Sequence, residues 1–365
     1  MIIFFDFFVK KIFHKTIKAI NNSLILGCKV HFGSFKIDRS SYWVIVRIMS
    51  NQTPDISKKL DNEVVYDFLI NHYGELSVDW VVHQWNWLNT NYKCFNDLIK
   101  YLIGIRLVQT TLEYYFENGI TVDYDKFYSE QSLQIEKFNI STLSKEFNLP
   151  KETMRRKIQE LEDQGVIRKK NKTIFFDRSA YNLVKPINQI KITSNYLHKI
   201  LKIMKKEGYV NKVISSDDIV KKIKLNFSRC WLWFYQFEIQ NIIGWKNYFQ
   251  DINEFYVLST CWINQVYNTQ NKINFSDTTN KILDNVHEFV TKNPGTGLNA
   301  LSISEMKGLP RATVIRKNKN LIKKNLLKLD EKKHYYVTYS ILKAVQPFVR
   351  EKNFRNKSVM IAKFL

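Results

Sequence analysis

Apolar residues recur every three or four positions along most of this chain, which is the spacing of amphipathic helices. Near residue 100, for example, they fall at positions 95, 98, 99, 102 and 103, and we expect these side chains to share one helical face. Gly and Pro, which interrupt helices, number only 11 and 6 among 365 residues. The pattern therefore predicts a mainly α protein with short connections.

A segment from the middle of the chain is repeated near its end. NLPKETMRRKIQELEDQGVIRKKNKTIFF begins at Asn148, and GLPRATVIRKNKNLIKKNLLKLDEKKHYYV begins at Gly308. A fainter repetition lies upstream, where Trp85-x-Trp87 matches Trp231-x-Trp233 and Phe95-x-Asp97 matches Phe249-x-Asp251. We predict an internal duplication in which each half is a helical bundle segment followed by a small α/β module.

The repeated segment has the pattern of two short helices joined by a tight turn. Asn148 and Gly308 stand at the same place in the two copies, and these residue types tolerate the left-handed conformation that ends a helix. Pro150 and Pro310 follow, and proline fits the start of the next helix. That helix has an apolar face in the first copy, formed by Met154, Ile158 and Leu161.

Each second helix is followed by the pattern of a β-hairpin. In the first copy Val166-Ile167 and residues 173–176 flank a basic turn. In the second copy Leu326-Leu327 and residues 335–337 flank residues 330–333. The predicted order in both copies is therefore helix, turn, helix and hairpin, which is that of a winged helix-turn-helix module.

Residues 106–177 resemble the DNA-binding domain of the cyclic-AMP-receptor class of bacterial regulators. The helix RLVQTTLEYYF, the strand LQI, the segment PKETMRRKIQELEDQGVI and the strand KTIFF follow the order of that family. The resemblance implies that the start of the second helix enters the major groove, where Lys151, Glu152 and Arg156 would contact base edges, and that Thr153 and the wing would contact phosphates. The segment of chain that precedes this domain is short and has a helical pattern, so the family's cyclic-nucleotide domain is not expected.

The chemistry of these side chains agrees with such a role, because Arg can bind guanine in a bidentate manner and Glu can accept from cytosine. We expect the base-reading residues to be Lys151, Glu152, Arg155, Arg156, Arg311 and Arg316. We expect the phosphate contacts to come from Thr153, Lys169, Lys170, Lys172, Thr313, Lys317, Lys332 and Lys333. The second copy has Ala312 in place of Glu152 and Asn318 in place of Ile158. Either its second helix is rotated slightly, or that helix contacts different bases.

The formal net charge of +22 fits a nucleic-acid partner, although an A+T-rich genome also enriches a chain in Lys. The placement of the charge is more informative than its sum. Seven basic residues and no acidic ones lie between Arg311 and Lys328, and eight basic and four acidic residues lie between Lys151 and Lys172. A solvated helix face is the alternative for both segments, and a protein-docking surface is a further alternative for the second.

Enzymatic and metal-binding functions have little support in the sequence. There is no phosphate-binding glycine loop, no G-x-S-x-G and no H-E-x-x-H, so we expect no catalysis and no cofactor. The four cysteines and seven histidines are scattered, which argues against a metal site or a disulfide framework and for a reducing cytosol. Asp217-Asp218 is expected to start a helix.

No stretch reaches the roughly 18 apolar residues of a membrane span, so no membrane partner is expected. The apolar stretch Met1 to Val9 is read as an interfacial helix, as a poor signal peptide, or as lying upstream of a true start at Met49. Nothing further rests on residues 1–48.

The expected organisation combines these elements. It consists of an uncertain extension (1–50), a helical segment (51–105), a first winged module (106–185), an aromatic-rich helical segment (186–278), a second module (279–345) and a basic tail (346–365). The aromatic stretch from Trp231 to Trp245 is expected to be buried core, with an aromatic ligand pocket as the alternative.

The leading hypothesis is a cytoplasmic, nucleoid-associated transcription regulator that binds double-stranded DNA. The alternative is a replication initiator of plasmid type, which also resembles two winged modules in tandem. RNA is less favoured, because its major groove is too deep and narrow for a reading helix. A homodimer and a small-molecule effector remain open.

Overall fold

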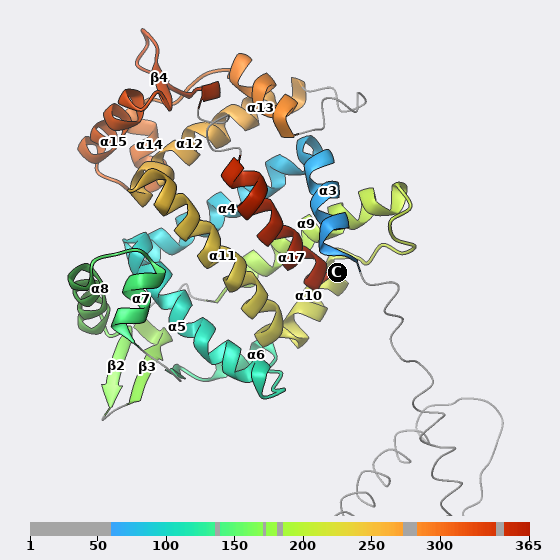
Figure 1. The fold of residues 1–365 in the computed structure, drawn as a ribbon, viewed down its shortest axis with the longest axis vertical. Coiled ribbons are helices and arrows are strands. Elements are labelled where there is room, and N and C mark those ends of the chain that lie inside the picture. The colour runs from blue at the N-terminus through green and yellow to red at the C-terminus, as the bar shows by residue number, and fades with distance from the viewer. Residues whose placement is uncertain (1–59, 136–138, 171–172, 181–184, 273–282, 341–346) are drawn as a thin grey trace, which may run out of the picture. The chain divides into compact units, whose positions relative to one another are not determined.

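The computed structural model describes residues 60–365 apart from 136–138, 171–172, 181–184, 273–282 and 341–346. Within these residues the protein is mainly helical, as the apolar spacing predicts (Figure 1). The expectations for residues 1–48 lie outside the described part.

The first half runs from α3 to α9. Its elements are α3 (Asn62–Asn71), α4 (Tyr73–Phe95), α5 (Leu98–Glu117), α6 (Tyr124–Ser129), β1 (Ser132–Ile135), α7 (Ile140–Glu146), α8 (Lys151–Asp163), β2 (Ile167–Lys170), β3 (Thr173–Asp177), η2 (Arg178–Ala180) and α9 (Ile187–Lys206).

The second half runs from α10 to α17. Its elements are α10 (Ser216–Leu225), α11 (Phe227–Phe249), α12 (Ile252–Thr269), η3 (Gln270–Lys272), α13 (Leu283–Lys292), α14 (Ala300–Lys307), α15 (Arg311–Lys323), β4 (Leu327–Leu329), β5 (Tyr335–Val337), the π-helical turn η5 (Val349–Phe354) and α17 (Arg355–Phe364).

The expected helical face from position 95 to position 103 is interrupted, and this corrects the sequence-based interpretation. Asn96 adopts a left-handed conformation with φ 51° and ends α4. Asp97 then starts α5, because its carboxylate accepts hydrogen bonds from the backbone N–H groups of Ile99 (2.7 Å) and Lys100 (3.1 Å). Phe95 therefore belongs to α4, and the domain boundary expected at 105/106 falls inside α5.

The second half repeats this break. Gln250 has φ 61° and ends α11, and the Asp251 carboxylate accepts from the N–H of Asn253 at 2.9 Å to start α12. The Phe-x-Asp repetition thus marks corresponding positions. The Trp-x-Trp repetition does not, because Trp85 lies in the middle of α4 whereas Trp231 lies in the first two turns of α11.

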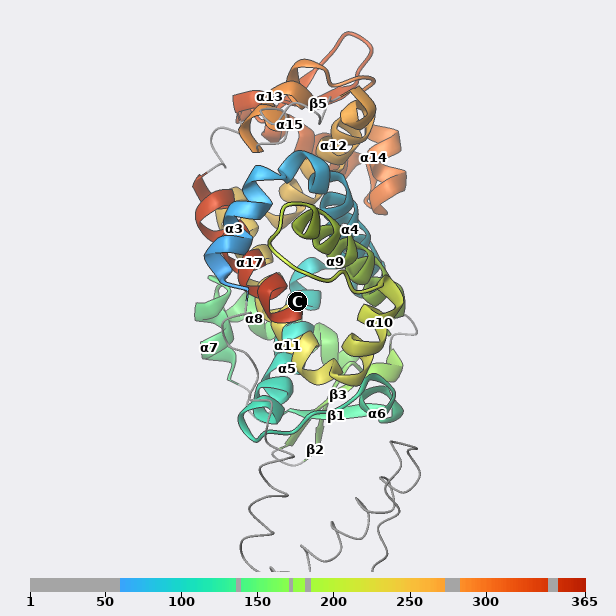
Figure 2. The ribbon, with the colours of Figure 1, turned by 90° about the vertical axis from the view of Figure 1, so that its right-hand side faces the viewer.

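Each half is closed by a helix that also packs against the other half. The helix α9 packs against α4 of its own half and against α10 of the second half (Figure 2). The helix α17 packs against α11 of its own half and returns to α3 of the first half (Figure 1). There Arg355 donates to both carboxylate oxygens of Glu63 at 2.8 and 2.9 Å.

Residues 346–365 therefore do not form the expected basic tail in their described part. Met360 and Ile361 of α17 are buried, and Lys357 is 2% exposed. The Lys357 ammonium lies 4.2 Å from the centre of the Trp80 ring and 4.7 Å from that of Phe354. The apolar stem and aromatic surroundings of this lysine make it part of the core.

The long helix α11 forms the centre of the core. Trp231 is fully buried and stacks between Phe227 and Phe234, with ring centroids 5.0 Å apart on both sides. This confirms the expected burial of the start of the aromatic stretch. Trp245, near its end, is half-buried and lines a cavity described below.

Glu238 of α11 is a carboxyl group inside this core. It is 0% exposed, and the neighbouring Gln84 side chain only partly offsets its loss of hydration. Burial raises the pKa of Glu238 to about 8, because the charged form loses its hydration. The side chain is therefore protonated in the folded protein at neutral pH.

The stability of the protein should reflect this buried carboxyl group. The unfolded chain releases the Glu238 proton near pH 4.3, whereas the folded chain retains it to about pH 8, so the free energy of unfolding should fall as pH rises between these values. The replacement Glu238→Gln should flatten this dependence and stabilise the protein at pH 8 by roughly 2–5 kcal/mol. Urea unfolding at pH 5 and pH 8 measures both effects, with Glu117→Gln on the surface as the control. Parallel pH profiles for wild type and Glu238→Gln would contradict this assignment.

Candidate nucleic-acid interface

The first helix–turn–helix unit (residues 132–177) is built by local side-chain hydrogen bonds. The Asn139 side chain caps α7 by accepting from the N–H groups of Ser141 (2.8 Å) and Thr142 (3.2 Å). Asn148 has φ 47° in the turn, as its position predicts. The Ser144 hydroxyl donates to the carbonyl of Leu149 at 2.6 Å and so fixes the turn before α8 begins.

The second helix–turn–helix unit (residues 298–337) uses the same devices. Asn299 caps α14 by accepting from the N–H of Ser302 at 2.9 Å. Gly308 has φ 67° in the turn, and the Ser304 hydroxyl donates to the carbonyl of Leu309 at 2.6 Å. The two turns therefore share their caps, their left-handed residue and their internal hydrogen bond.

The helices α8 and α15 bury corresponding faces. Met154, Ile158 and Leu161 are buried in α8, and Val314, Asn318 and Leu321 occupy the corresponding places in α15. Asn318 is 0% exposed, so α15 is not rotated to bring this side chain to the surface. Among the described residues, neither its side-chain oxygen nor its nitrogen has a hydrogen-bond partner.

The expected base-reading residues of the first unit lie on the outer face of α8. The side chains of Glu152, Arg155 and Arg156 are 80%, 59% and 69% exposed, and Lys151 is also exposed. Arg155 donates to the Glu152 carboxylate at 2.5 Å, while Arg156 is 3.9 Å from Glu160. Thr153 is half-buried. The outer face therefore presents donors and one acceptor from a single helix.

In the second unit, Arg311 and Arg316 are exposed on α15, and Thr313 is half-buried. Neither arginine forms an ion pair with another described residue, whereas Arg155 is paired within α8. The exposed Lys319 and Lys323 extend the basic face of α15 beyond the residues chosen from the sequence. Their position in the helical repeat was the signal that could have identified them.

Lys157 and Lys317 have a different role from that of the exposed arginines. Lys157 is only 16% exposed and contacts Asp97 at 2.8 Å and Glu160 at 2.9 Å. Lys317, expected at a phosphate, is 12% exposed and forms an ion pair with Asp251. The ammonium group of Lys317 therefore faces the scaffold, and we call these two ion pairs the lysine–aspartate clamps.

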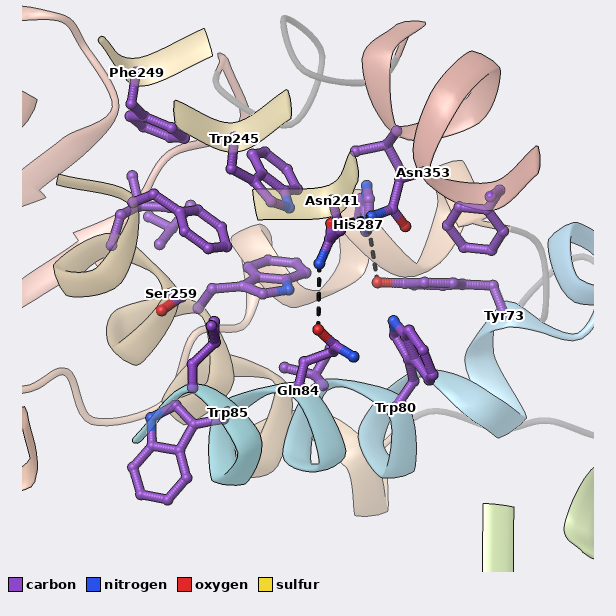
Figure 3. A pocket seen from close by; sticks show the side chains of 18 residues that line it. Tyr73, Trp80, Gln84, Trp85, Asn241, Trp245, Phe249, Ser259, His287 and Asn353 are labelled. Carbon is purple, nitrogen blue, oxygen red and sulfur yellow. Dashed lines mark hydrogen bonds between the residues drawn. The ribbon is translucent and has the colours of Figure 1, made fainter. Parts of the chain in front are cut away.

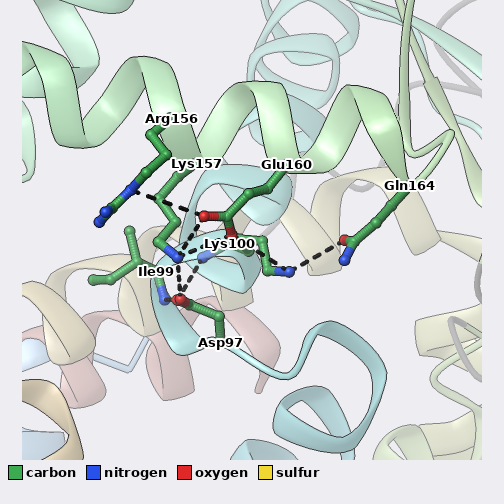
Figure 4. Close-up of polar contacts among 7 residues, drawn as sticks. All are labelled: Asp97, Ile99, Lys100, Arg156, Lys157, Glu160 and Gln164. Atoms are coloured by element: carbon green, nitrogen blue, oxygen red, sulfur yellow. Dashed lines mark hydrogen bonds and ion pairs between the residues drawn. The ribbon is translucent and has the colours of Figure 1, made fainter.

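The clamps join each outer helix to the start of its scaffold helix. In the first half, Lys100 of α5 adds contacts to Gln164 (3.2 Å) and Glu160 (3.8 Å), as Figure 4 shows. In the second half, Lys324, which directly follows α15, pairs with the buried Glu254 of α12 at 2.6 Å, and Asn320 of α15 donates to the same carboxylate at 3.3 Å. The aspartate that caps the scaffold helix thus also positions the outer helix.

The hairpins differ in size between the two units. In the first, β1, β3 and β2 form an antiparallel sheet in that order, with Ile167 opposite Phe176. In the second, β4 and β5 pair with Leu327 opposite Val337, and an isolated bridge joins Leu298 to Tyr335.

The lysines expected at phosphates lie around these hairpins. Lys169 is exposed but paired with Glu162, while Lys170 is exposed without an ion pair in the described part. Lys172 lies outside the described residues. Lys332 and Lys333 are exposed in the turn between β4 and β5, where Lys333 has φ 62°.

A buried lysine distinguishes the second unit from the first. Lys307 ends α14 at the position that Phe147 occupies after α7, and it is 1% exposed. Its ammonium donates to the side-chain oxygen of Asn89 at 3.0 Å and lies 3.7 Å from the centre of the Tyr256 ring. Burial holds the pKa of Lys307 well below its usual value. This lysine anchors the second unit on α4 and is not part of the outer face.

Other kinds of site find no support in the described part of the chain. No group of three His, Cys, Asp or Glu side chains is placed to hold a metal there. Cys94, Cys230 and Cys261 are free thiols. No described helix is both long and apolar enough to cross a membrane. Asp217 and Asp218 lie in the first turn of α10, where the sequence predicted a helix start.

Comparison with family models, with curated proteins and with solved structures found no match to this chain.

The unpaired Asn318 gives a direct test of the correspondence between α8 and α15. We expect Asn318→Ile, which introduces the residue found at position 158, to stabilise the protein by about 1–3 kcal/mol, because a buried amide without partners is removed. The reciprocal change Ile158→Asn should destabilise by at least as much. Chemical unfolding of both variants measures the difference, and destabilisation by Asn318→Ile would show that the two positions are not equivalent.

Proposed function

We propose that this chain binds double-stranded DNA in a sequence-specific manner through α8 and α15, and that it acts as a transcription regulator. The observation that carries the proposal is that the same exposed, arginine-bearing helix occurs twice and is held in both halves by a lysine–aspartate clamp. A helix whose inner face is fixed by the scaffold can present its outer face rigidly to a major groove.

The order of elements supports assignment to the winged helix-turn-helix class. In each unit a short helix, a tight turn, an outer helix and a hairpin follow one another. In such modules the second helix enters the major groove and the hairpin lies near the backbone. Arg156 and Arg316, at corresponding positions, are then the side chains best suited to guanine, and Lys170 and Lys332 are suited to phosphates.

The placement of the two units supports simultaneous use of both. Figure 1 shows α8 and α15 on the same side of the described part, with α15 above α8. A single chain would then present two outer helices to successive grooves of one duplex, as dimeric regulators do with two chains. The two half-sites would be related but unequal, because Glu152 of α8 is replaced by Ala312 in α15.

A replication initiator of plasmid type is the second candidate. The observation that favours it is the tandem arrangement itself, since two similar units in one chain resemble that class. Both candidates require the same DNA-binding surface, and they differ in the target. A position beside an origin with repeated sites would favour the initiator, and a position upstream of a promoter would favour the regulator.

We expect Arg156→Ala to weaken binding to the selected site by about 1–3 kcal/mol and to relax the preference at one base pair. The matched variant Lys170→Ala should weaken binding to specific and to random DNA equally. It should also reduce by about one the slope of the logarithm of the binding constant against the logarithm of the salt concentration. Fluorescence anisotropy over a salt series, on a site selected from random DNA, measures both. Equal losses on specific and random DNA for Arg156→Ala would remove its base-reading role.

Footprinting should show two protected major grooves on one face of the duplex for the intact protein. In the Arg156→Ala protein one of the two should weaken, and in the Arg316→Ala protein the other should weaken. The pair of variants serves as its own control, because each leaves the other unit intact. A single protected groove with a monomeric protein would contradict the two-unit proposal.

A further inference from the structure

A cavity of about 150 Å³ lies between α4 of the first half and α11, α12 and α13 of the second half (Figure 3). Residues of η5 and of β5 complete its wall. Cavities at the junction of two structural units are common positions for small-molecule sites. An apolar cavity of about this volume is large enough to hold benzene.

Aromatic rings make up half of the residues that line the cavity. Trp245 stacks on Phe255 with ring centroids 4.7 Å apart and an interplanar angle of 10°. Trp262 meets His287 edge to face at 5.3 Å, and Tyr73 meets the same imidazole at 5.1 Å. Planar walls of this kind favour a planar guest, because stacked and edge-to-face contacts add to the gain from apolar burial.

A short chain of amide groups gives the cavity a polar side. Asn353 donates to the Asn241 side-chain oxygen at 2.5 Å, and Asn241 donates to that of Gln84 at 3.2 Å. Figure 3 shows these three side chains reaching across the cavity from α4, α11 and η5. They supply hydrogen-bonding groups from three separate elements at one place.

His287 adds a further polar group to the wall. Its Nε2 is 3.1 Å from the Tyr73 hydroxyl, and its Nδ1 is buried without a partner among the described residues. Burial lowers the pKa of His287 to about 4, so the ring is neutral at physiological pH. A buried imidazole nitrogen without a partner costs free energy that a ligand hydroxyl would recover.

The same place in the first half is also hollow. Counted from the capping residues Asp97 and Asp251, positions 91, 101 and 108 correspond to 245, 255 and 262, and the former line a cavity of about 690 Å³. There the side chains are Asn91, Tyr101 and Val108. Cavities therefore occur at corresponding places in both halves. The one in the second half differs because two of these three positions are tryptophan, Trp245 and Trp262.

We propose that the cavity between α4 and α12 binds a small single-ring aromatic compound that carries a hydroxyl group, and that this ligand acts on α15. The ring would lie among Trp245, Phe255 and Trp262. The hydroxyl would bond to the amide chain or to His287.

The route from the cavity to α15 is short. Phe249 and Phe255 in the wall flank Asp251, which holds Lys317 of α15 in the second clamp. Val337 in the wall belongs to the hairpin that follows α15. A ligand that tightens this wall therefore stabilises the elements that position α15, which provides the differential contact that coupling between two sites requires.

The test uses the full chain with phenol as the probe, and calorimetry as the measurement. We expect phenol to bind with a dissociation constant on the order of 0.1–1 mM, as is reasonable for so small a ligand. Benzene, which lacks the hydroxyl, should bind several-fold and up to about tenfold more weakly. The bulkier 4-tert-butylphenol should bind much more weakly, because its butyl group exceeds the cavity volume of about 150 Å³.

Substitutions at Ser259, whose side chain lines the cavity, locate the site. Ser259→Phe should fill the space and abolish phenol binding, while the matched Ser259→Ala should retain it. The comparison of phenol with 4-tert-butylphenol on the wild-type chain tests the size limit even where Ser259→Phe does not fold. Phenol should also slow amide hydrogen exchange in Arg311–Lys323 of the wild type and not in a folded Ser259→Phe protein.

Absence of phenol binding, or equal binding of phenol and 4-tert-butylphenol, overturns the site. Phenol binding that leaves exchange in α15 unchanged overturns the coupling. Neither measurement uses DNA, so a failure here is distinguishable from a failure of the proposed function.

Discussion

The pairing of a helix-capping aspartate with a lysine from the outer helix is the interaction on which the arrangement of both units depends. Asp97 and Asp251 each satisfy backbone N–H groups at the start of a scaffold helix, and each also receives a lysine from α8 or α15. An exposed ion pair contributes little, but these lysines are largely buried and the partner carboxylate is already fixed by its cap. The clamps therefore act mainly by setting the orientation of each outer helix on its scaffold.

The features of the fold that the sequence predicts are those that single residues determine locally. Asn148, Gly308 and the two prolines identify the turns from sequence because each residue meets a backbone requirement of its own position. The break at Asp97 was missed, since the apolar spacing continues across it and a single capping residue does not alter that spacing. The role of Lys317 was not predictable, because its partner Asp251 lies 66 positions away and only tertiary structure brings the two together. The aromatic stretch from Trp231 to Trp245 allowed a ligand pocket as an alternative, and Trp245 does line the cavity, but the other walls come from distant helices that no local pattern could identify.

The buried positions beneath the outer helices differ between the two halves. Phe147 and Ile158, both apolar and buried, correspond to Lys307 and Asn318. Lys307 finds an amide oxygen and an aromatic ring, whereas Asn318 finds no partner among the described residues. Lys307 thus anchors the second unit, whereas the unpaired Asn318 lowers the stability of the packing beneath α15.

The exchange of closing helices has a consequence for how the chain reaches its final form. Because α17 completes the packing of α3, and Arg355 pairs with Glu63 across a separation of 292 residues, the first half lacks one of its covering helices until α17 has been synthesised. Contacts this distant in sequence slow folding, since the entropy of a long loop must be overcome before they form. During translation the apolar side of α3 therefore stays uncovered by α17 for most of synthesis, and apolar surface that is exposed in this way favours aggregation.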